Sequence, residues 1–137
     1  MNGAKKTRVG GAILLAFAAA ALMKLFWFDF IVAEGRSMTP AIKNGSLLFV
    51  NKLAFGFRPP FSNRYVARWA LPRKGDVVLF WTPFGDLAVK RCGGLSSEAD
   101  GDAPRWVALG DNAPSSFDSR SYGPLPLDSI IGKAPGF

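Results

Sequence analysis

The hydrophobic pattern of the chain is dominated by one long apolar stretch near the N-terminus. Val9–Met23 contains no charged residue, Lys24 interrupts the pattern, and apolar residues resume over Leu25–Phe28 and continue to Val32. The uninterrupted part is about 15 residues long. With Leu25–Phe28 it approaches the roughly 20 residues that span a bilayer, provided that Lys24 extends toward the headgroups. The pattern therefore predicts a transmembrane anchor over residues 9–32.

The residues that flank this stretch predict its orientation. Residues 1–8 contain the basic side chains Lys5, Lys6 and Arg8, and basic flanks stay on the cytoplasmic side. We therefore expect residues 1–8 to be cytoplasmic and residues 33–137 to form a domain on the outer side. A cleavable secretory signal has the same basic start and apolar core, so a size comparison of the mature and full-length proteins decides between retention and cleavage.

Beyond residue 33, short β-like runs alternate with turn residues. The runs are Leu47–Val50, Val77–Trp81, Leu87–Cys92, Trp106–Leu109 and Ile130–Ile131. Pro83 and Gly85–Asp86 predict a turn that joins the second and third runs into a hairpin carrying Lys90. We expect a mainly β, antiparallel fold with a single core, because only about 100 residues remain after the anchor.

Five aromatic residues lie in a stretch rich in proline, glycine and arginine, and their spacing has no clear period. They are Phe55, Phe57, Phe61, Tyr65 and Trp69. Such side chains pack in a core in most proteins, and in an amphipathic loop they lie on a membrane surface. The sequence leaves both interpretations open.

The composition removes several kinds of catalytic site. The chain has no histidine and one cysteine, Cys92, so an intramolecular disulfide, a cysteine–histidine pair and an ordinary zinc site are excluded. Paired carboxylates remain possible, although the few acidic residues lie mostly in turn-like surroundings. We expect neither a metal nor another cofactor.

The formal net charge of +7 comes partly from the N-terminus and partly from a second basic stretch. That stretch contains Arg58, Arg64, Arg68, Arg73 and Lys74. Phosphates of a nucleic acid are one possible partner for such residues. Anionic lipid headgroups beside the anchor are the expected partner, and we expect no nucleic acid.

A serine, Ser37, follows soon after the apolar stretch. A serine nucleophile without histidine needs another base, and lysine can serve when burial lowers its pKa. An ordinary lysine has a pKa near 10.4 and is protonated at neutral pH. Lys90 follows apolar residues, and we expect Leu87, Val89 and the aromatic residues of the preceding run to surround it.

Four stretches, in this order, resemble the sequence boxes of bacterial type I signal peptidases. They are Gly35–Pro40 with Ser-Met-x-Pro, Arg73–Phe80 with Gly-Asp-Val-Val, Val89–Leu95 with Lys-Arg, and Gly110–Arg120 with Gly-Asp-Asn and Ser-x-Asp-Ser-Arg. Ile131–Ala134 also fits the family's ending. The resemblance covers nearly the whole chain.

The resemblance implies a serine–lysine dyad. The Ser37 Oγ would attack the scissile carbonyl to form an acyl-enzyme, Lys90 would be the general base, and Ser116 would hydrogen-bond and orient Lys90. Met38 is a candidate wall of the substrate pocket. The nucleophile box also contains Gly35 and Pro40. The residues expected to support the site structurally are Arg91, Gly110, Asp111, Asn112, Asp118 and Arg120, with Asp118 and Arg120 as a pair that holds their loop.

Two features depart from other family members. Some have a serine two residues before the nucleophile, and its hydroxyl helps to stabilise the oxyanion. Here Gly35 occupies that position, so the oxyanion hole would consist of the Ser37 N–H and a second donor that the sequence does not identify. The interval between Arg91 and Gly110 is too short for the accessory β-domain of larger relatives. The resemblance thus implies a minimal catalytic core.

The function implied by the resemblance is that of a membrane-anchored serine endopeptidase. It would remove signal peptides from secreted preproteins, cutting after small residues at the first and third positions before the bond. It would lie in the bacterial cytoplasmic membrane as a single-pass protein, in contact with lipid. Two alternatives stay open: a related peptidase that processes pilins or conjugation proteins, and a noncatalytic anchored β-module that binds lipid or a partner.

Overall fold

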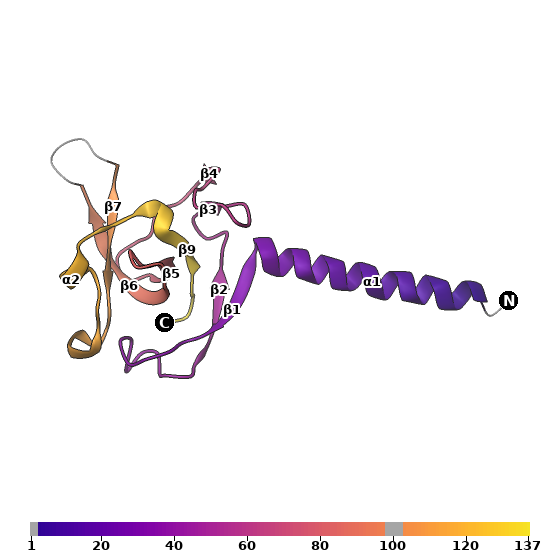
Figure 1. Cartoon of the computed structure of the whole chain (residues 1–137), viewed down its shortest axis with the longest axis horizontal. Helices are drawn as coiled ribbons and strands as arrows, with labels where there is room; N and C mark the ends of the chain where they lie inside the picture. The colour runs from indigo at the N-terminus through magenta and orange to yellow at the C-terminus, as the bar shows by residue number, and fades with distance from the viewer. Residues whose placement is uncertain (1–2, 98–102) are drawn as a thin grey trace.

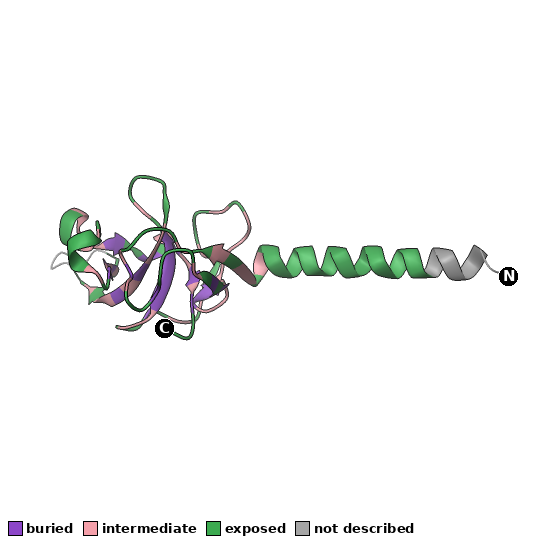
Figure 2. Ribbon diagram, turned by 90° about the horizontal axis from the view of Figure 1, so that it is seen from below, coloured by how far each residue is buried: buried purple, intermediate pink, exposed green. Residues whose placement is uncertain are grey.

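The computed structural model describes residues 3–97 and 103–137, and it consists of a long N-terminal helix followed by a β domain (Figure 1). Helix α1, Gly3–Phe26, projects away from the β domain. Its segment Val9–Phe26 has a mean hydropathy of 2.1, and 0% of it is buried (Figure 2). By length and composition, α1 can therefore cross a bilayer. The side chains of residues 1–8, on which the predicted orientation rests, lie outside the described part.

Helix α1 ends before the predicted anchor, residues 9–32, does. It ends at Phe26, and Phe28–Val32 form strand β1, which pairs antiparallel with β2, Leu47–Asn51. Within β1, the Asp29 carboxylate forms an ion pair with Lys52 at 3.2 Å. Such a pair is favourable at the surface of a domain and costly in hydrocarbon. The sequence prediction missed this boundary because a short apolar run is compatible with both a helix and a strand.

The β domain is built on a curled antiparallel sheet with the strand order β1-β2-β9-β5-β6-β7-β8. Its further strands are β5 Val77–Trp81, β6 Leu87–Ser96, β7 Arg105–Leu109, β8 Leu125–Pro126 and β9 Ile130–Lys133. The smaller elements are β3 Gly56–Phe57, which pairs with β4 Ala67–Arg68, the short helix α2 Ser119–Tyr122, and the 3-10 turns Ala113–Ser115 and Leu127–Ser129. The predicted mainly β, antiparallel fold is confirmed, and every predicted run lies in a strand.

The β5–β6 hairpin fixes the position of Lys90. Its turn is closed by hydrogen bonds in both directions between Thr82 and Asp86, at 2.8 and 3.1 Å. The resulting register places Val78 opposite Lys90. Because side chains alternate along a strand, Lys90 lies on the buried face of β6 and Arg91 on the other face.

Two apolar clusters form the core. The larger one contains Phe80 and Trp106, whose rings meet edge to face with centroids 4.8 Å apart. The smaller one packs Met38 and Ile42 against Leu48 and other residues of the sheet. Since Met38 directly follows Ser37, burial of the Met38 side chain ties the segment that carries the predicted nucleophile to the sheet.

The aromatic stretch between residues 55 and 69 divides between the two interpretations. Phe55 is buried in the larger cluster, and Phe57 stacks on Phe26 of α1 with ring centroids 6.0 Å apart. Phe61 and Trp69 are exposed. The stretch is therefore neither a core segment nor a surface loop as a whole, which explains why its aromatic residues follow no single period.

Candidate active site

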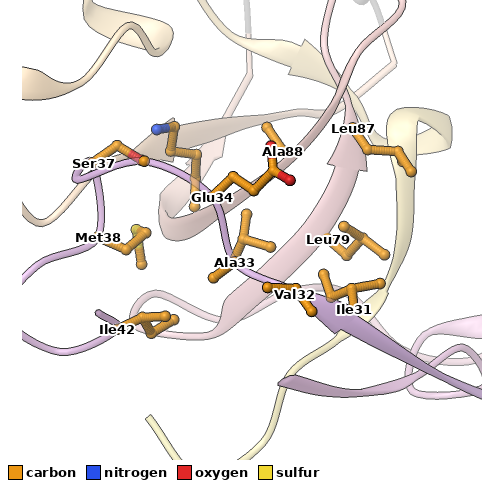
Figure 3. A pocket seen from close by; sticks show the side chains of 13 residues that line it. Ile31, Val32, Ala33, Glu34, Ser37, Met38, Ile42, Leu79, Leu87 and Ala88 are labelled. Atoms are coloured by element: carbon orange, nitrogen blue, oxygen red, sulfur yellow. The ribbon is translucent and has the colours of Figure 1, made fainter. Parts of the chain in front are cut away.

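A cleft of about 370 Å³ opens between the segment that leads to Ser37 and the beginning of β6 (Figure 3). Its lining residues are Ile31, Val32, Ala33, Glu34, Gly35, Ser37, Met38, Ile42, Leu79, Leu87, Ala88, Val89 and Lys90. Apart from Ser37, Lys90 and Glu34, these residues are apolar or glycine. The cleft thus combines one hydroxyl, one amine and one carboxylate with otherwise apolar walls.

Ser37 lies at the cleft in a segment that is held by hydrogen bonds on both sides. The Gly35 N–H donates to the Asn44 Oδ1 at 2.9 Å, and the Asn112 N–H donates to the Ser37 carbonyl oxygen at 2.9 Å. Gly35 has a φ of +85°, a left-handed conformation that favours glycine. A serine at this position would carry a backbone cost that glycine avoids.

Lys90 reaches the same cleft from β6, and only 5% of its surface is exposed. Burial lowers the pKa of Lys90, the Asp118 carboxylate acts in the opposite direction, and the Arg120 guanidinium adds to the lowering. Within residues 9–97 and 103–137, neither the Lys90 Nζ nor the Ser37 Oγ takes part in a hydrogen bond. Catalytic hydrogen bonds commonly tighten only once substrate is bound.

Ser116, Asp118 and Arg120 form a hydrogen-bonded network behind the cleft. The Ser116 Oγ donates to the Asp118 Oδ2 at 2.6 Å, the Gly110 N–H donates to the same oxygen at 2.8 Å, and the Arg120 Nε donates to the Asp118 Oδ1 at 2.9 Å. Burial alone would raise the pKa of Asp118, but these hydrogen bonds outweigh burial and hold it well below its usual range. Asp118 is therefore a buried carboxylate with its charge matched by Arg120.

Gly110 is the point where this network meets the nucleophile segment. A methyl group at Gly110 would lie 2.7 Å from the Ser37 carbonyl oxygen and closer still to the Ser116 side chain. No room exists for any side chain there. From the sequence, Gly110 was expected to have a structural role. The structure shows that glycine is needed at this position because of close packing and not because of its backbone conformation.

Replacement of Gly110 by alanine is accordingly expected to lower kcat about 100-fold, because a displacement of about 1 Å at a reacting group has an effect of that size. The measurement is kcat on a peptide substrate, together with unfolding in urea. The matched control is Gly56→Ala, which also forces a methyl group against backbone, near Ala67 and remote from the cleft. The control should lose stability and keep its kcat, and an equal loss of kcat in both variants would contradict the prediction.

The other predicted residues lie outside the lining of the cleft. Arg91 donates two hydrogen bonds to the Asp111 carboxylate, both at 2.8 Å, on the far side of β6. The Asn112 Nδ2 donates to the Thr39 Oγ1 at 3.0 Å, next to the exposed Pro40. These contacts hold the 110–112 turn against both β6 and the nucleophile segment.

Sequence reasoning missed part of the cleft. It expected the aromatic residues of the run before Lys90 to line the pocket, but β5 contributes Leu79, while Phe80 points into the larger core cluster. It also missed Ile31, Ala33 and Glu34. The alternation of Ile31 and Ala33 before the nucleophile was an available signal, which the assignment of this run to the anchor concealed.

The donor set contains no candidate metal site. Among the residues that the structure describes, no group of three or more His, Cys, Asp or Glu side chains could hold a metal ion. The cleft offers a hydroxyl and an amine of lowered pKa, the groups that nucleophilic catalysis at a carbonyl requires.

Comparison with known proteins gives a consistent result. The family model described as signal peptidase, peptidase S26, matches residues 6–99 and 104–136. Signal peptidase I of Bacillus caldolyticus is 29% identical to this chain over an alignment 155 residues long. The alignment covers 87% of this chain and 84% of that protein. Signal peptidase I of Pseudomonas aeruginosa is 31% identical over 104 residues, 73% of this chain and 32% of that protein. A third, from Buchnera aphidicola, is 27% identical over 78 residues, 56% of this chain and 25% of that protein.

The chain thus matches most of the Bacillus protein and less than a third of the other two. Because the family model extends over nearly the whole chain, the resemblance to bacterial type I signal peptidases is confirmed. The chain therefore belongs to the signal peptidase family, peptidase S26, as an enzyme of the signal peptidase I type.

Proposed function

We propose that this protein is a membrane-anchored serine endopeptidase that removes signal peptides from secreted preproteins through a Ser37–Lys90 dyad. The observation that carries the proposal is the presence of a serine and a nearly buried lysine in one cleft, in a chain without histidine. Lys90 can serve as the base there, because burial lowers its pKa.

The reaction then proceeds through an acyl-enzyme. The neutral Lys90 Nζ takes the proton of the Ser37 hydroxyl while the Oγ bonds to the scissile carbonyl carbon. When the carbon–nitrogen bond breaks, the Lys90 ammonium returns this proton to the leaving amine. Lys90 next takes a proton from water as the water oxygen attacks the ester. Release of the signal peptide carboxyl returns the proton to the Ser37 Oγ.

Ser116 suits the role of positioning Lys90. Its hydroxyl proton is donated to Asp118, so the lone pairs of its oxygen are free to accept an N–H of Lys90. An amine that donates to Ser116 can direct its own lone pair toward Ser37. Asp118, with its charge matched by Arg120, fixes the direction of the Ser116 hydroxyl without strongly favouring a protonated Lys90.

The oxyanion would be stabilised by the backbone N–H of Ser37. In the described part of the chain no acceptor binds this N–H, whereas the N–H of Gly35 is already donated to Asn44. Gly35 therefore supplies neither a side-chain nor a backbone donor. One such donor contributes about 3 kcal/mol to transition-state stabilisation.

Two free sheet edges favour an extended substrate in the cleft. β1 is the edge strand of the sheet, and residues 87–90 of β6 pair with β5 alone, since β7 pairs with β6 only from Arg91 onward. An extended peptide placed between them can hydrogen-bond to backbone on either side. Its side chains at the first and third positions before the bond point to one face, and Met38 and Val89 of the cleft lining would form the walls that restrict these positions to small groups.

Helix α1 would serve as the membrane anchor. With the N-terminus inside, the catalytic domain lies on the outer side of the bacterial cytoplasmic membrane, in contact with lipid and close to preproteins that are still in the bilayer. The exposed apolar surface of Val9–Phe26 supports this placement.

The proposal is tested by giving purified full-length protein, in detergent, a preprotein with an Ala-x-Ala site. Cleavage after the second alanine, loss of cleavage when that alanine becomes phenylalanine, and no cleavage by Ser37→Ala are the expected results. A noncatalytic module would leave the preprotein intact, and equal cleavage by Ser37→Ala would remove Ser37 from the mechanism.

The pH dependence of the reaction should follow Lys90. Because the base must be neutral, kcat/KM falls as the pH decreases through the pKa of Lys90. The midpoint of this acid limb of the profile should lie below the ordinary lysine pKa, which is near 10.4. Arg120→Met removes a charge that lowers the pKa of Lys90, so the limb should move to higher pH. Profiles of kcat/KM from pH 6 to 11 measure the shift. Arg64→Met, at an exposed position, is the control, and a limb that stays fixed or moves to lower pH in Arg120→Met would contradict the electrostatic argument.

A further inference from the structure

The catalytic cleft continues into a second groove. This groove has a volume of about 360 Å³ and shares Ile31, Leu79 and Leu87 with the cleft. Its further apolar walls are Leu25, Pro59, Pro60, Phe61, Trp81 and Ile131, and its polar lining residues are Asp29, Lys52, Arg58, Ser62 and Asn63. The residues of this groove that lie outside the cleft take no part in the proposed mechanism.

The second groove extends from the cleft toward the end of helix α1. Leu25, in the last turn of α1, lines one part of it, and the three shared residues form the boundary with the cleft. With α1 in the bilayer, the groove lies between the membrane and Ser37. A chain that leaves the membrane and reaches Ser37 therefore passes along it.

The wall formed by residues 59–61 is firmly held. The Arg58 guanidinium donates to the Ser62 carbonyl oxygen at 2.5 Å and to the Ile130 carbonyl oxygen of β9 at 3.1 Å. Phe61 is nevertheless fully exposed, at 101%, and its φ is +65°. A left-handed backbone is costly for a bulky residue, and such a conformation is maintained at sites where a ligand is bound.

We propose that the second groove binds the apolar segment of the signal peptide that lies upstream of the scissile bond, with Phe61 packed against it. This inference rests on the proposed function. In a signal peptide, an apolar stretch of about 7–15 residues precedes the small-residue site. At about 3.3 Å per extended residue, roughly three residues fill the cleft, and the following upstream residues reach Leu87 and enter the groove.

The direction of the substrate follows from the same geometry. The upstream segment is the part of the signal peptide that resides in the membrane. The second groove reaches α1, and the cleft does not. The residues after the bond then leave past Ser37, away from the bilayer. Nine of the fourteen residues that line the groove are apolar, so the groove matches an apolar segment.

The test compares two peptides with one Ala-x-Ala site, cleaved by the full-length protein in detergent micelles. The short peptide begins three residues before the bond, and the long peptide carries four additional leucines upstream. We expect kcat/KM to be about tenfold higher for the long peptide, the size that burial of an aromatic side chain predicts. Phe61→Ala should remove this advantage and leave the short peptide unaffected, and Phe61→Leu should retain most of it.

Trp69→Ala is the matched control, because Trp69 is an exposed aromatic residue outside the groove. It should behave as wild type toward both peptides. Equal rates of wild type and Phe61→Ala on the long peptide would overturn the groove assignment, and so would an equal loss on both peptides; either result leaves the proposed function intact. Cleavage of neither peptide by wild type would overturn the proposed function, and the groove assignment with it.

Discussion

Replacement of Lys90 by methionine is expected to lower kcat/KM by a factor of about 10⁴ or more, comparable with loss of a member of a catalytic serine–base pair in other proteases. Methionine retains most of the length and apolar contacts of lysine and removes the amine. The chain has no histidine, and among the described residues that line the cleft the exposed Glu34 carboxylate is the one other group that can accept a proton. Ser37 would then keep its proton.

This loss should occur in a folded protein. A buried ammonium is unfavourable, as the lowered pKa of Lys90 indicates, so Lys90→Met should unfold at the same or a higher urea concentration than wild type. Lys74→Met, at an exposed position, is the matched control and should keep full activity. Residual activity above about one per cent in Lys90→Met would contradict the role of Lys90 as base, since even one positioned proton-transfer group contributes about 10²-fold or more.

The strands of the β domain were predictable because their sequences are short apolar runs bounded by glycine, proline and aspartate. The Ser37 and Lys90 candidates followed from chemistry, since a chain without histidine leaves lysine as the base. Their presence in one cleft did not follow from composition. It depends on the β5–β6 register that sets Lys90 opposite Val78 and on the curl of the sheet that brings β1 near β6.

Three features lay beyond the sequence for identifiable physical reasons. The end of α1 at Phe26 depends on the pairing of β1 with β2, a long-range interaction that local hydropathy does not contain. The need for glycine at position 110 comes from the Ser116 side chain of the same loop and from the Ser37 backbone, which is distant in sequence. Phe61 is exposed in a loop that Arg58 joins to Ile130 of β9 by a hydrogen bond. Each is a tertiary property, and a local pattern carries no signal for it.

Replacement of Asp118 by alanine is expected to lower the free energy of unfolding by about 3 kcal/mol, because buried hydrogen-bond donors left without an acceptor cost about 1–3 kcal/mol each. Asp118 is 0% exposed and accepts hydrogen bonds from Ser116, Gly110 and Arg120. Its loss leaves the Ser116 hydroxyl and the Gly110 N–H without an acceptor. The loop that carries Ser116, the proposed positioning residue for Lys90, would loosen, so kcat should fall together with stability.

The matched control for this variant is Asp128→Ala. Asp128 also pairs with an arginine, at 2.7 Å from Arg68, but its side chain is 48% exposed. An exposed pair contributes about 0–1 kcal/mol, so the control should unfold almost as wild type does. Urea denaturation of both variants at pH 7 measures the difference. Equal destabilisation of the two would contradict the argument that burial of Asp118 makes its pair structurally important.

The effect of Asp118 should also depend on pH, with a defined sign. Its pKa in the folded protein lies below that of the unfolded chain, near 3.9 for an ordinary aspartate. The stabilisation is therefore complete at pH values above about 4 and is lost as the pH falls toward the lower pKa of the folded state. Wild type should approach the stability of Asp118→Ala as the pH falls below 4. A difference between them that stayed constant down to pH 2 would mean that packing of the side chain, and not its charge, holds the loop behind Lys90.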